Sequence, residues 1–196
     1  MLDRPLILLD LETTGATASF DRITEIGLIE VENGEYVREW STLVNPQMHI
    51  SSFIESLTGI SNEMVADAPT FAAVAAELTA RLAGRLLVAH NARFDYGFLR
   101  AEFARLDTAY ASEVICTVKL SRKLFPGHRR HNLDTLIERH EIQCEARHRA
   151  LGDARVLWDL LATWRVNPGC DALVAAATAQ LQKRAVRSAA PTPAVA

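Results

Sequence analysis

Residues 5–11, PLILLDL, form the stretch that decides the fold. An uninterrupted apolar run of this length is typical of a strand that is buried on both faces in the middle of a sheet. Asn33-Gly34 lies between two further strand-like runs and is a strong signal for a β-hairpin. The predicted strands cover residues 5–11, 23–32, 36–44, 86–89 and 113–117.

Helical segments follow the hairpin and then alternate with the last two strands. Apolar residues at three- and four-residue spacing and alanine-rich composition predict helices at residues 51–57, 70–83, 92–106, 117–124, 132–140, 149–165 and 172–187. This order predicts an α/β domain, a mixed sheet flanked by helices, over residues 1–168. We expect a C-terminal helix within 169–187 and a disordered tail or linker at 188–196.

Composition places the chain among ordinary globular proteins, with 49% hydrophobic and 23% charged residues among 196. No apolar run approaches the roughly 18–20 residues that a membrane span needs, and acids interrupt the apolar N-terminal stretch, so we expect neither a membrane anchor nor a signal peptide. The cysteines are few and irregularly spaced, which favours buried free thiols in a reducing cytoplasm over a disulfide framework or a zinc cluster. They are Cys116, Cys144 and Cys170.

Charge is distributed unevenly along the chain. Residues 1–80 carry 3 basic and 13 acidic side chains, whereas the remaining residues carry 18 basic and 11 acidic ones. Five basic residues without an intervening acid occur within 119–131, and such a run forms either a solvated surface or a set of phosphate contacts. These residues are Lys119, Arg122, Lys123, Arg129 and Arg130.

Asp10 and Glu12 stand at the end of the first predicted strand. Residues two apart on a strand share a face, so the two carboxylates repel each other unless a cation lies between them. Asp95 falls in the first turn of the helix that follows the fourth strand, with Asn91 as the expected N-cap. Each feature also has a simpler interpretation, a solvated strand end for the pair and a favourable helix dipole for Asp95.

Asp153 begins a predicted amphipathic helix on the side that faces the interior, where a carboxylate needs a cation or hydrogen bonds. His148 precedes that helix and can reach the same pocket. Four carboxylates suffice to hold two divalent cations across a phosphodiester, and an oxygen-rich site suits Mg²⁺. A histidine of near-neutral pKa could then take the proton of the attacking water.

Three motifs in this order resemble those of the DEDD superfamily of 3′–5′ exonucleases. They are similar above all to the proofreading exonuclease of bacterial DNA polymerase III, which occurs as the epsilon subunit and inside PolC. The motifs are 10–15 (DLETTG), 90–95 (HNARFD) and 148–153 (HRALGD), and the similar intervening stretches are 21–27 (DRITEIG), 57–60 (LTGI) and 132–136 (NLDTL).

The resemblance implies an RNase H-like fold with a five-stranded mixed sheet. It also implies removal of nucleotides from DNA 3′ ends with two divalent cations, Mg²⁺ or Mn²⁺. His148 lies five residues before Asp153, as in the histidine subgroup known as DEDDh, and would be the general base. Asp10 would bridge both metals, Glu12 would complete one site with Asp153, and Asp95 would act through metal-bound water. Substrate contacts are expected from Thr13, Thr14, His90, Asn91 and Phe94.

Several alternatives stay open. A catalytically dead binding module of the same fold would lack at least one of the five key residues, and none is missing here. The oligoribonuclease group of RNA-trimming exonucleases has a different second motif, but a preference for DNA over RNA follows only by analogy, so an RNA 3′-trimming exonuclease stays an alternative. A transposase-like nuclease would lack the histidine arrangement. The replicative epsilon subunit carries a clamp-binding segment, and residues 180–184 (QLQKR) lack its apolar anchor. We therefore expect a proofreading or repair enzyme with a polymerase or a fused nuclease module as a possible partner.

Overall fold

A computed structural model of the chain describes residues 4–144, 146–167, 169–170, 172–173, 175–176 and 179. Its centre is a five-stranded sheet with the order β3-β2-β1-β4-β5. The strands are β1 (Leu6–Thr13), β2 (Ile23–Glu32), β3 (Glu35–Leu43), β4 (Leu86–Ala89) and β5 (Val114–Cys116). The first three strands are antiparallel, whereas β4 pairs with β1 in parallel and β5 pairs with β4 in parallel. The expected mixed α/β sheet is confirmed.

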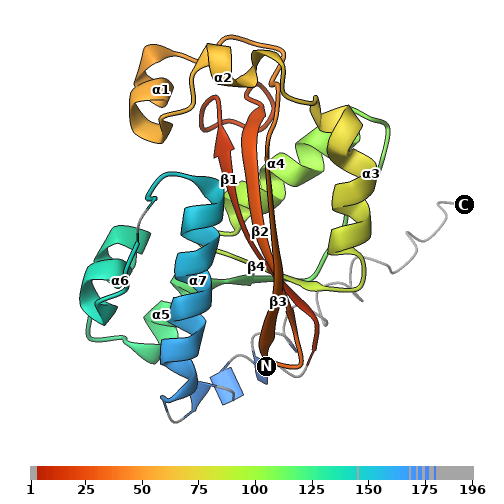
Figure 1. The fold of residues 1–196 in the computed structure, drawn as a ribbon. Coiled ribbons are helices and arrows are strands. Elements are labelled where there is room, and N and C mark those ends of the chain that lie inside the picture. Colours follow the sequence, from red (N-terminus) through yellow and green to blue (C-terminus); the bar gives the residue numbers. More distant parts are fainter. Residues whose placement is uncertain are drawn as a thin grey trace, which may run out of the picture.

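Helices cover both faces of this sheet (Figure 1). They are α1 (Ser52–Thr58), α2 (Asn62–Ala66), α3 (Phe71–Leu82), α4 (Arg93–Ala104), α5 (Thr117–Leu124), α6 (Leu133–His140) and α7 (Ala150–Arg165). On one face, β1 packs against α5, α6 and α7, and on the other against α3 and α4. None of the helices among the described residues is long and apolar enough to cross a membrane.

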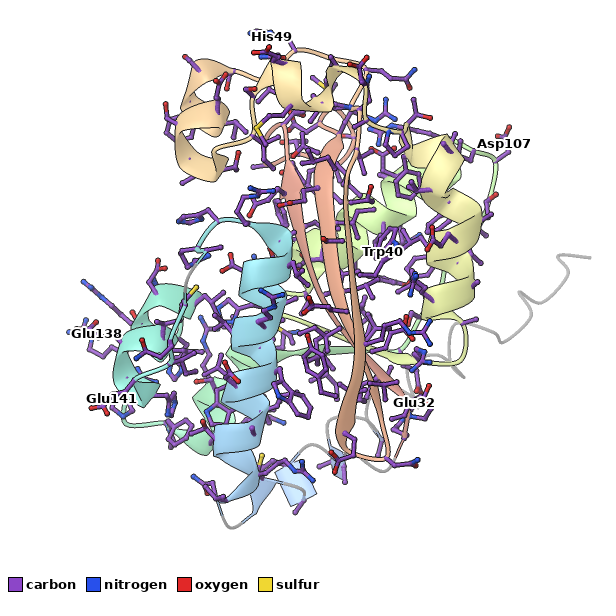
Figure 2. All side chains as sticks on the ribbon, viewed as in Figure 1. Glu32, Trp40, His49, Asp107, Glu138 and Glu141 are labelled. Atoms are coloured by element: carbon purple, nitrogen blue, oxygen red, sulfur yellow. The ribbon has the colours of Figure 1, made fainter. Side chains whose placement is uncertain are left out.

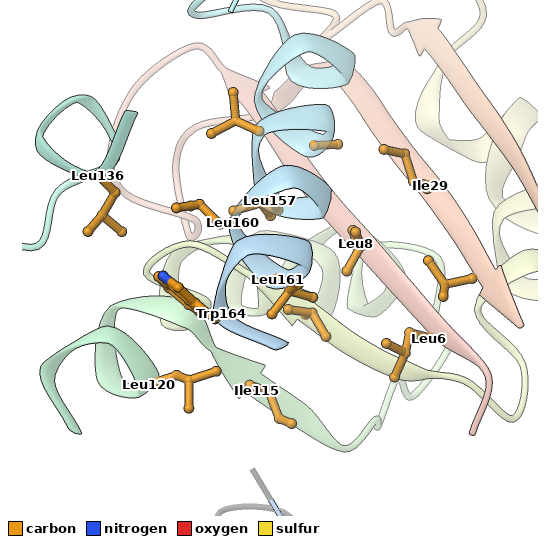
Figure 3. Packing of buried hydrophobic residues seen from close by; sticks show 14 of the residues in the cluster. Leu6, Leu8, Ile29, Ile115, Leu120, Leu136, Leu157, Leu160, Leu161 and Trp164 are labelled. Carbon is orange, nitrogen blue, oxygen red and sulfur yellow. The ribbon is translucent and has the colours of Figure 1, made fainter. Parts of the chain in front are cut away.

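The alternation of β1 residues explains how both faces are buried. Leu6 and Leu8 pack with Leu157 and Leu161 of α7 (Figure 3), whereas the intervening Ile7 and the later Leu9 and Leu11 join the core under α3 and α4. On that second face Trp40 of β3 packs toward α3 (Figure 2). Because successive strand residues alternate, Asp10 and Glu12 share the face of Leu6 and Leu8 and therefore face α7.

Most predicted elements agree with the structure to within two residues at each end. The hairpin at Asn33-Gly34 is confirmed, and both residues have the positive φ, 52° and 79°, that a tight two-residue turn requires. The short helix α2 was not predicted, because five residues are too few for an apolar repeat. Its capping residue, Ser61, accepts a hydrogen bond from the Met64 amide and was the available signal.

Two local predictions are wrong. Asn91 is not the N-cap of α4, which begins after Ala92; Asn91 instead has a positive φ of 57°. Of the cysteines, Cys170 is buried, but Cys116 and Cys144 are partly exposed; the three are not linked by disulfides.

Of the expected C-terminal helix, the described residues between 170 and 179 are helical, and its remainder and the tail at 188–196 lie outside the described residues.

Candidate active site

A pocket opens at the end of the sheet where β1 and β4 end and α4 and α7 begin. Its volume is about 290 Å³. The lining residues are Asp10, Leu11, Glu12, His90, Asn91, Phe94, Asp95, Asn132, Leu133, Asp134, Arg147, His148 and Asp153. All three sequence motifs therefore meet in one place, although they are separated by more than 50 residues along the chain.

Three of the four acids already have the spacing of a metal site. One carboxylate oxygen from each of Asp10, Glu12 and Asp153 lies within 4.8 Å of the others. Asp95 adds a fourth carboxylate to the same pocket, and its Oδ2 atom is buried without a hydrogen-bond partner. Buried, unpartnered carboxylate oxygens are costly unless a cation reaches them.

The approach of α7 to β1 depends on one glycine. Gly27 of β2 is the register partner of Asp10, and a Cβ atom at Gly27 would lie 2.2 Å from the backbone nitrogen of Leu151 and 2.3 Å from the carbonyl carbon of Ala150. The first turn of α7 therefore rests directly on the backbone of β2. This contact brings Asp153, in that same turn, beside Asp10.

Two buried glutamates hold the two helices that supply the remaining acids. Glu25 of β2 accepts hydrogen bonds from the Arg149 guanidinium (2.6 Å) and from the Ala150 amide at the start of α7 (2.9 Å). Glu102 of α4 accepts two hydrogen bonds from Arg22, at 2.8 and 3.0 Å, just before β2 begins. Both helices are thus attached to β2, the neighbour of β1, by ion pairs that are partly shielded from water.

The carboxylates of the pocket resist ionisation. Burial is the largest cause for each acid, and the neighbouring acids raise the pKa values of Asp10 and Glu12 further. The pKa of Glu12 is raised to about 7, that of Asp95 to about 8 and that of Asp153 to about 6, while that of Asp10 lies well above its ordinary value. These raised pKa values indicate that the four acids are fully ionised together near neutral pH only when a cation lies among them.

Both histidines of the pocket are held neutral. Burial lowers the pKa of His90 to about 4, and its Nδ1 atom lies 2.9 Å from the Thr117 hydroxyl. Burial and the nearby Arg147 also lower the pKa of His148. His148 is less buried than His90, and its φ of 58° is unusual for a residue other than glycine. A neutral imidazole at the rim of the pocket can accept a proton.

Thr13 and Thr14 do not line the pocket. The Thr13 hydroxyl donates to the Gly15 carbonyl at 2.6 Å, and the Thr14 hydroxyl accepts from the Arg22 amide at 3.0 Å. Both residues are buried, Thr13 as the last residue of β1 and Thr14 in the loop that follows. Their proposed contact with the terminal nucleotide stays a prediction.

Five lining residues, among them Leu11 of β1, received no role in the sequence analysis. Asn132, Leu133 and Asp134 begin α6, and the stretch that contains them had been noted as similar to the family. Arg147 bonds to both Asp134 (2.7 Å) and Asp153. Its place directly before His148 was the only sequence signal that Arg147 could belong to the site. Its pairing with Asp134 and Asp153 depends on tertiary structure.

Comparison with known proteins agrees with this geometry. Residues 7–161 match the family described as RNase_T exonuclease. A PolC-type DNA polymerase III from Caldanaerobacter subterraneus subsp. tengcongensis is 40% identical over 154 residues, which are 79% of this chain and 11% of the relative. The 3′-5′ exonuclease DinG of Bacillus subtilis is 40% identical over 152 residues, 76% of this chain and 16% of the relative. The chain thus spans only a tenth to a sixth of the length of these two relatives.

Solved structures show the same architecture. Exonuclease X, determined in complex with 5′ overhanging duplex DNA, aligns with a TM-score of 0.65 and 31% identity, over 81% of this chain and 92% of that one. Exonuclease I aligns with a TM-score of 0.78 over 84% of this chain and 41% of that one, and at 17% identity it supports the RNase H-like fold alone. On the strength of the family match and these relatives, the chain belongs to the DnaQ-like, DEDDh family of 3′–5′ exonucleases.

Proposed function

We propose that this chain hydrolyses DNA from the 3′ end to nucleoside monophosphates with two divalent cations, Mg²⁺ or Mn²⁺, in proofreading or repair. The observation that carries the proposal is the placement of carboxylate oxygens from Asp10, Glu12 and Asp153 within 4.8 Å of one another. The mutual repulsion of carboxylates at this spacing is offset when a cation binds between them.

The pocket fits divalent cations on structural grounds. Asp95 Oδ2 and Asp153 Oδ1 are buried without hydrogen-bond partners, so each has an unused lone pair directed into protein. All four acids are oxygen donors, which Mg²⁺ and Mn²⁺ prefer over sulfur and nitrogen donors. When bound, a pair of such ions stabilises the attacking and the leaving oxygen of an in-line displacement.

The protein groups around the acids suit the other parts of the reaction. His148 is neutral near pH 7, because burial and Arg147 lower its pKa, and it can take the proton of the nucleophilic water. Phe94 offers an aromatic surface at the pocket wall for a terminal base. His90 and Asn91 line the same wall, and His90 is fixed by Thr117. We assign these residues to substrate binding.

The relatives support the direction and the substrate of the proposed reaction. One is named as a 3′-5′ exonuclease, another as a DNA polymerase, and one solved relative is in complex with duplex DNA. An RNA 3′ end would fit the same chemistry. Attachment to a polymerase or to a second nuclease module, and a cytoplasmic location, stay predictions.

End-labelled oligonucleotides test the proposal. With Mg²⁺, a DNA strand labelled at its 5′ end should yield a ladder of shortened products, and a strand labelled at its 3′ end should release labelled mononucleotide first. EDTA and Asp10→Asn should each abolish both. Asp107→Asn is the matched control, because Asp107 lies in an exposed loop at a positive φ that asparagine tolerates (Figure 2). Activity that survives EDTA, or faster degradation of a matched RNA, would contradict the proposal.

A further inference from the structure

Arg147 bridges two carboxylates at the mouth of the pocket. Its Nε atom donates to Asp134 Oδ1 at 2.7 Å, and its Nη1 atom donates to Asp153 Oδ2. The two acids differ in environment, because the Asp153 side chain is 4% exposed and that of Asp134 is 62% exposed. Arg147 therefore spans the boundary between the interior of the site and solvent.

Arg147 is also the one arginine or lysine among the lining residues, all of which the structure describes. Burial lowers its pKa, but Asp153, Asp134 and Asp10 outweigh that effect and raise it. The guanidinium in turn offsets part of the rise in the pKa values of Asp10, Glu12 and Asp153. It is the fixed positive charge that partly neutralises the acids in the absence of a metal ion.

The position of this charge conflicts with a cation in the same site. Asp153 is one of the three acids that converge within 4.8 Å; its Oδ2 atom accepts from Arg147, and its Oδ1 atom is buried without a hydrogen-bond partner. A divalent cation bound to Asp153 would lie close to a guanidinium that is always protonated, and the two positive charges would repel each other at short range. This repulsion favours loss of the contact between Arg147 and Asp153 when a cation binds the carboxylate.

We propose that Arg147 competes with the divalent cation for Asp153, and that metal binding transfers the guanidinium from Asp153 to Asp134 alone. This inference rests on the metal site of the proposed function. Asp134 is suited to retain Arg147, since its carboxylate already accepts the Nε donor and faces solvent. Arg147 then keeps the acids together before metal binding and weakens the affinity for the metal.

Titration calorimetry with Mg²⁺ at pH 8.5 tests the competition without any measurement of catalysis. Arg147→Gln removes the charge and should bind Mg²⁺ about tenfold more tightly than the wild type, a change that corresponds to the loss of one moderate ion pair. Arg155→Gln is the matched control, because Arg155 lies on the surface of α7 and pairs with Glu39 of β3 outside the pocket. It should bind Mg²⁺ with wild-type affinity.

Asp134→Asn provides a second, opposite test. Without Asp134 the displaced guanidinium has no acceptor, so Mg²⁺ should bind more weakly than to the wild type. In the Arg147→Gln background the same substitution should have a much smaller effect, because the residue through which it acts is gone. This cycle also separates the proposed exchange from a general loss of negative charge.

The Mg²⁺ affinities of these variants can contradict the inference in several ways. Unchanged or weaker Mg²⁺ binding by Arg147→Gln would overturn the inference, as would an equal effect of Asp134→Asn in both backgrounds. If Arg147→Gln does not fold, unchanged Mg²⁺ binding by Asp134→Asn alone overturns it. Absence of Mg²⁺ binding by the wild type would refute the metal site itself, and the proposed function would fail with it.

Discussion

Glu25 and Arg149 form an ion pair that joins the beginning of β2 to the residue before α7, across 124 positions of sequence. Arg149 donates to both carboxylate oxygens, and the Ala150 amide donates to Oε2 at 2.9 Å. Glu25 is 5% exposed and is the register partner of Glu12. A buried carboxylate at the beginning of a helix satisfies an otherwise unpaired amide and complements the helix dipole. The position of Asp153 therefore depends on a residue outside the pocket.

Glu25→Gln should lower the free energy of unfolding and should also weaken metal binding. The amide oxygen still accepts from Ala150, but the charged pair with Arg149 is lost, so the first turn of α7 is held less firmly. We expect the free energy of unfolding to fall by about 2 kcal/mol, the usual contribution of a hydrogen bond to a charged group. The Mg²⁺ concentration needed for half-maximal activity should rise. Denaturant unfolding and activity against Mg²⁺ concentration measure the two effects.

The matched control is Glu30→Gln, because Glu30 is also a buried glutamate of β2 and pairs with Arg81 of α3, which carries none of the site acids. Glu25→Asp should restore part of the metal affinity, because it restores the charge on a shorter side chain. If Glu25→Gln lowers stability but leaves the Mg²⁺ requirement at the wild-type value, Glu25 has a purely structural role.

The metal-free protein should lose stability as pH rises from 6.5 to 8.5. In this window the folded protein retains protons on Glu12 (pKa about 7) and Asp95 (pKa about 8) that the unfolded chain has already released, so the unfolding free energy falls with pH. The histidines of the pocket have lowered pKa values and contribute with the opposite sign until the unfolded imidazoles, with an ordinary pKa of 6.5, have lost their protons, so they reduce the decrease in the lower part of the window without reversing it.

Thermal and denaturant unfolding in EDTA should show this decrease, on the order of 2 kcal/mol over the window. Saturating Mg²⁺ should remove it, because a bound cation favours the ionised carboxylates. Asp95→Asn should make the EDTA profile flatter. A stability that is constant or rises with pH in EDTA would show that the acids are ionised without a cation.

The sequence predicted those parts of the site that rest on local patterns. Alternation along an apolar strand puts Asp10 and Glu12 on the same face. Helix boundaries in the sequence put Asp95 and Asp153 in the first turns of their helices. The same alternation puts Leu11 on the opposite face, where it joins the core under α3 and α4. These features could be predicted because each depends on neighbours within a few residues.

The parts that were not predicted depend on contacts between distant segments. Glu25 is one of three glutamates in β2, and nothing near it in sequence shows that its partners are Arg149 and Ala150. Arg147 was visible only as a basic residue next to His148. Its two acidic partners come from α6 and α7, and their meeting depends on how these helices pack.

His148→Ala should reduce the rate of hydrolysis roughly 10²–10⁴-fold, the usual contribution of a general base. Mg²⁺ affinity should change little, because the four acids stay in place. His49→Ala is the matched control, since His49 is exposed and lies outside the pocket (Figure 2). Single-turnover rates on a DNA oligonucleotide, with Mg²⁺ titrations on the same samples, measure both quantities. A rate within a few fold of the wild type would exclude His148 as the base.

Arg129 and Arg130 should contact the phosphates of the substrate strand. Both are exposed, and they lie just before Asn132 and Asp134, which line the pocket, so a strand that leaves the pocket on this side would pass them. Each phosphate contact adds about 0.7 to the slope of log affinity against log salt for a single strand. Arg129→Gln with Arg130→Gln should therefore make that slope shallower by about 1 to 1.5.

The charge-matched control for this pair is Arg38→Gln with Arg155→Gln, because Arg38 and Arg155 are exposed on β3 and α7 and neither lines the pocket. Binding of a single-stranded DNA oligonucleotide in Ca²⁺, which occupies oxygen-rich sites, is measured between about 50 and 200 mM salt. A general effect of net charge would flatten the slope equally in both double variants. A slope that changes only for Arg129 and Arg130 would locate the path of the strand along the segment between α5 and α6. If neither variant alters the slope, the basic run is a solvated surface and the strand leaves the pocket elsewhere.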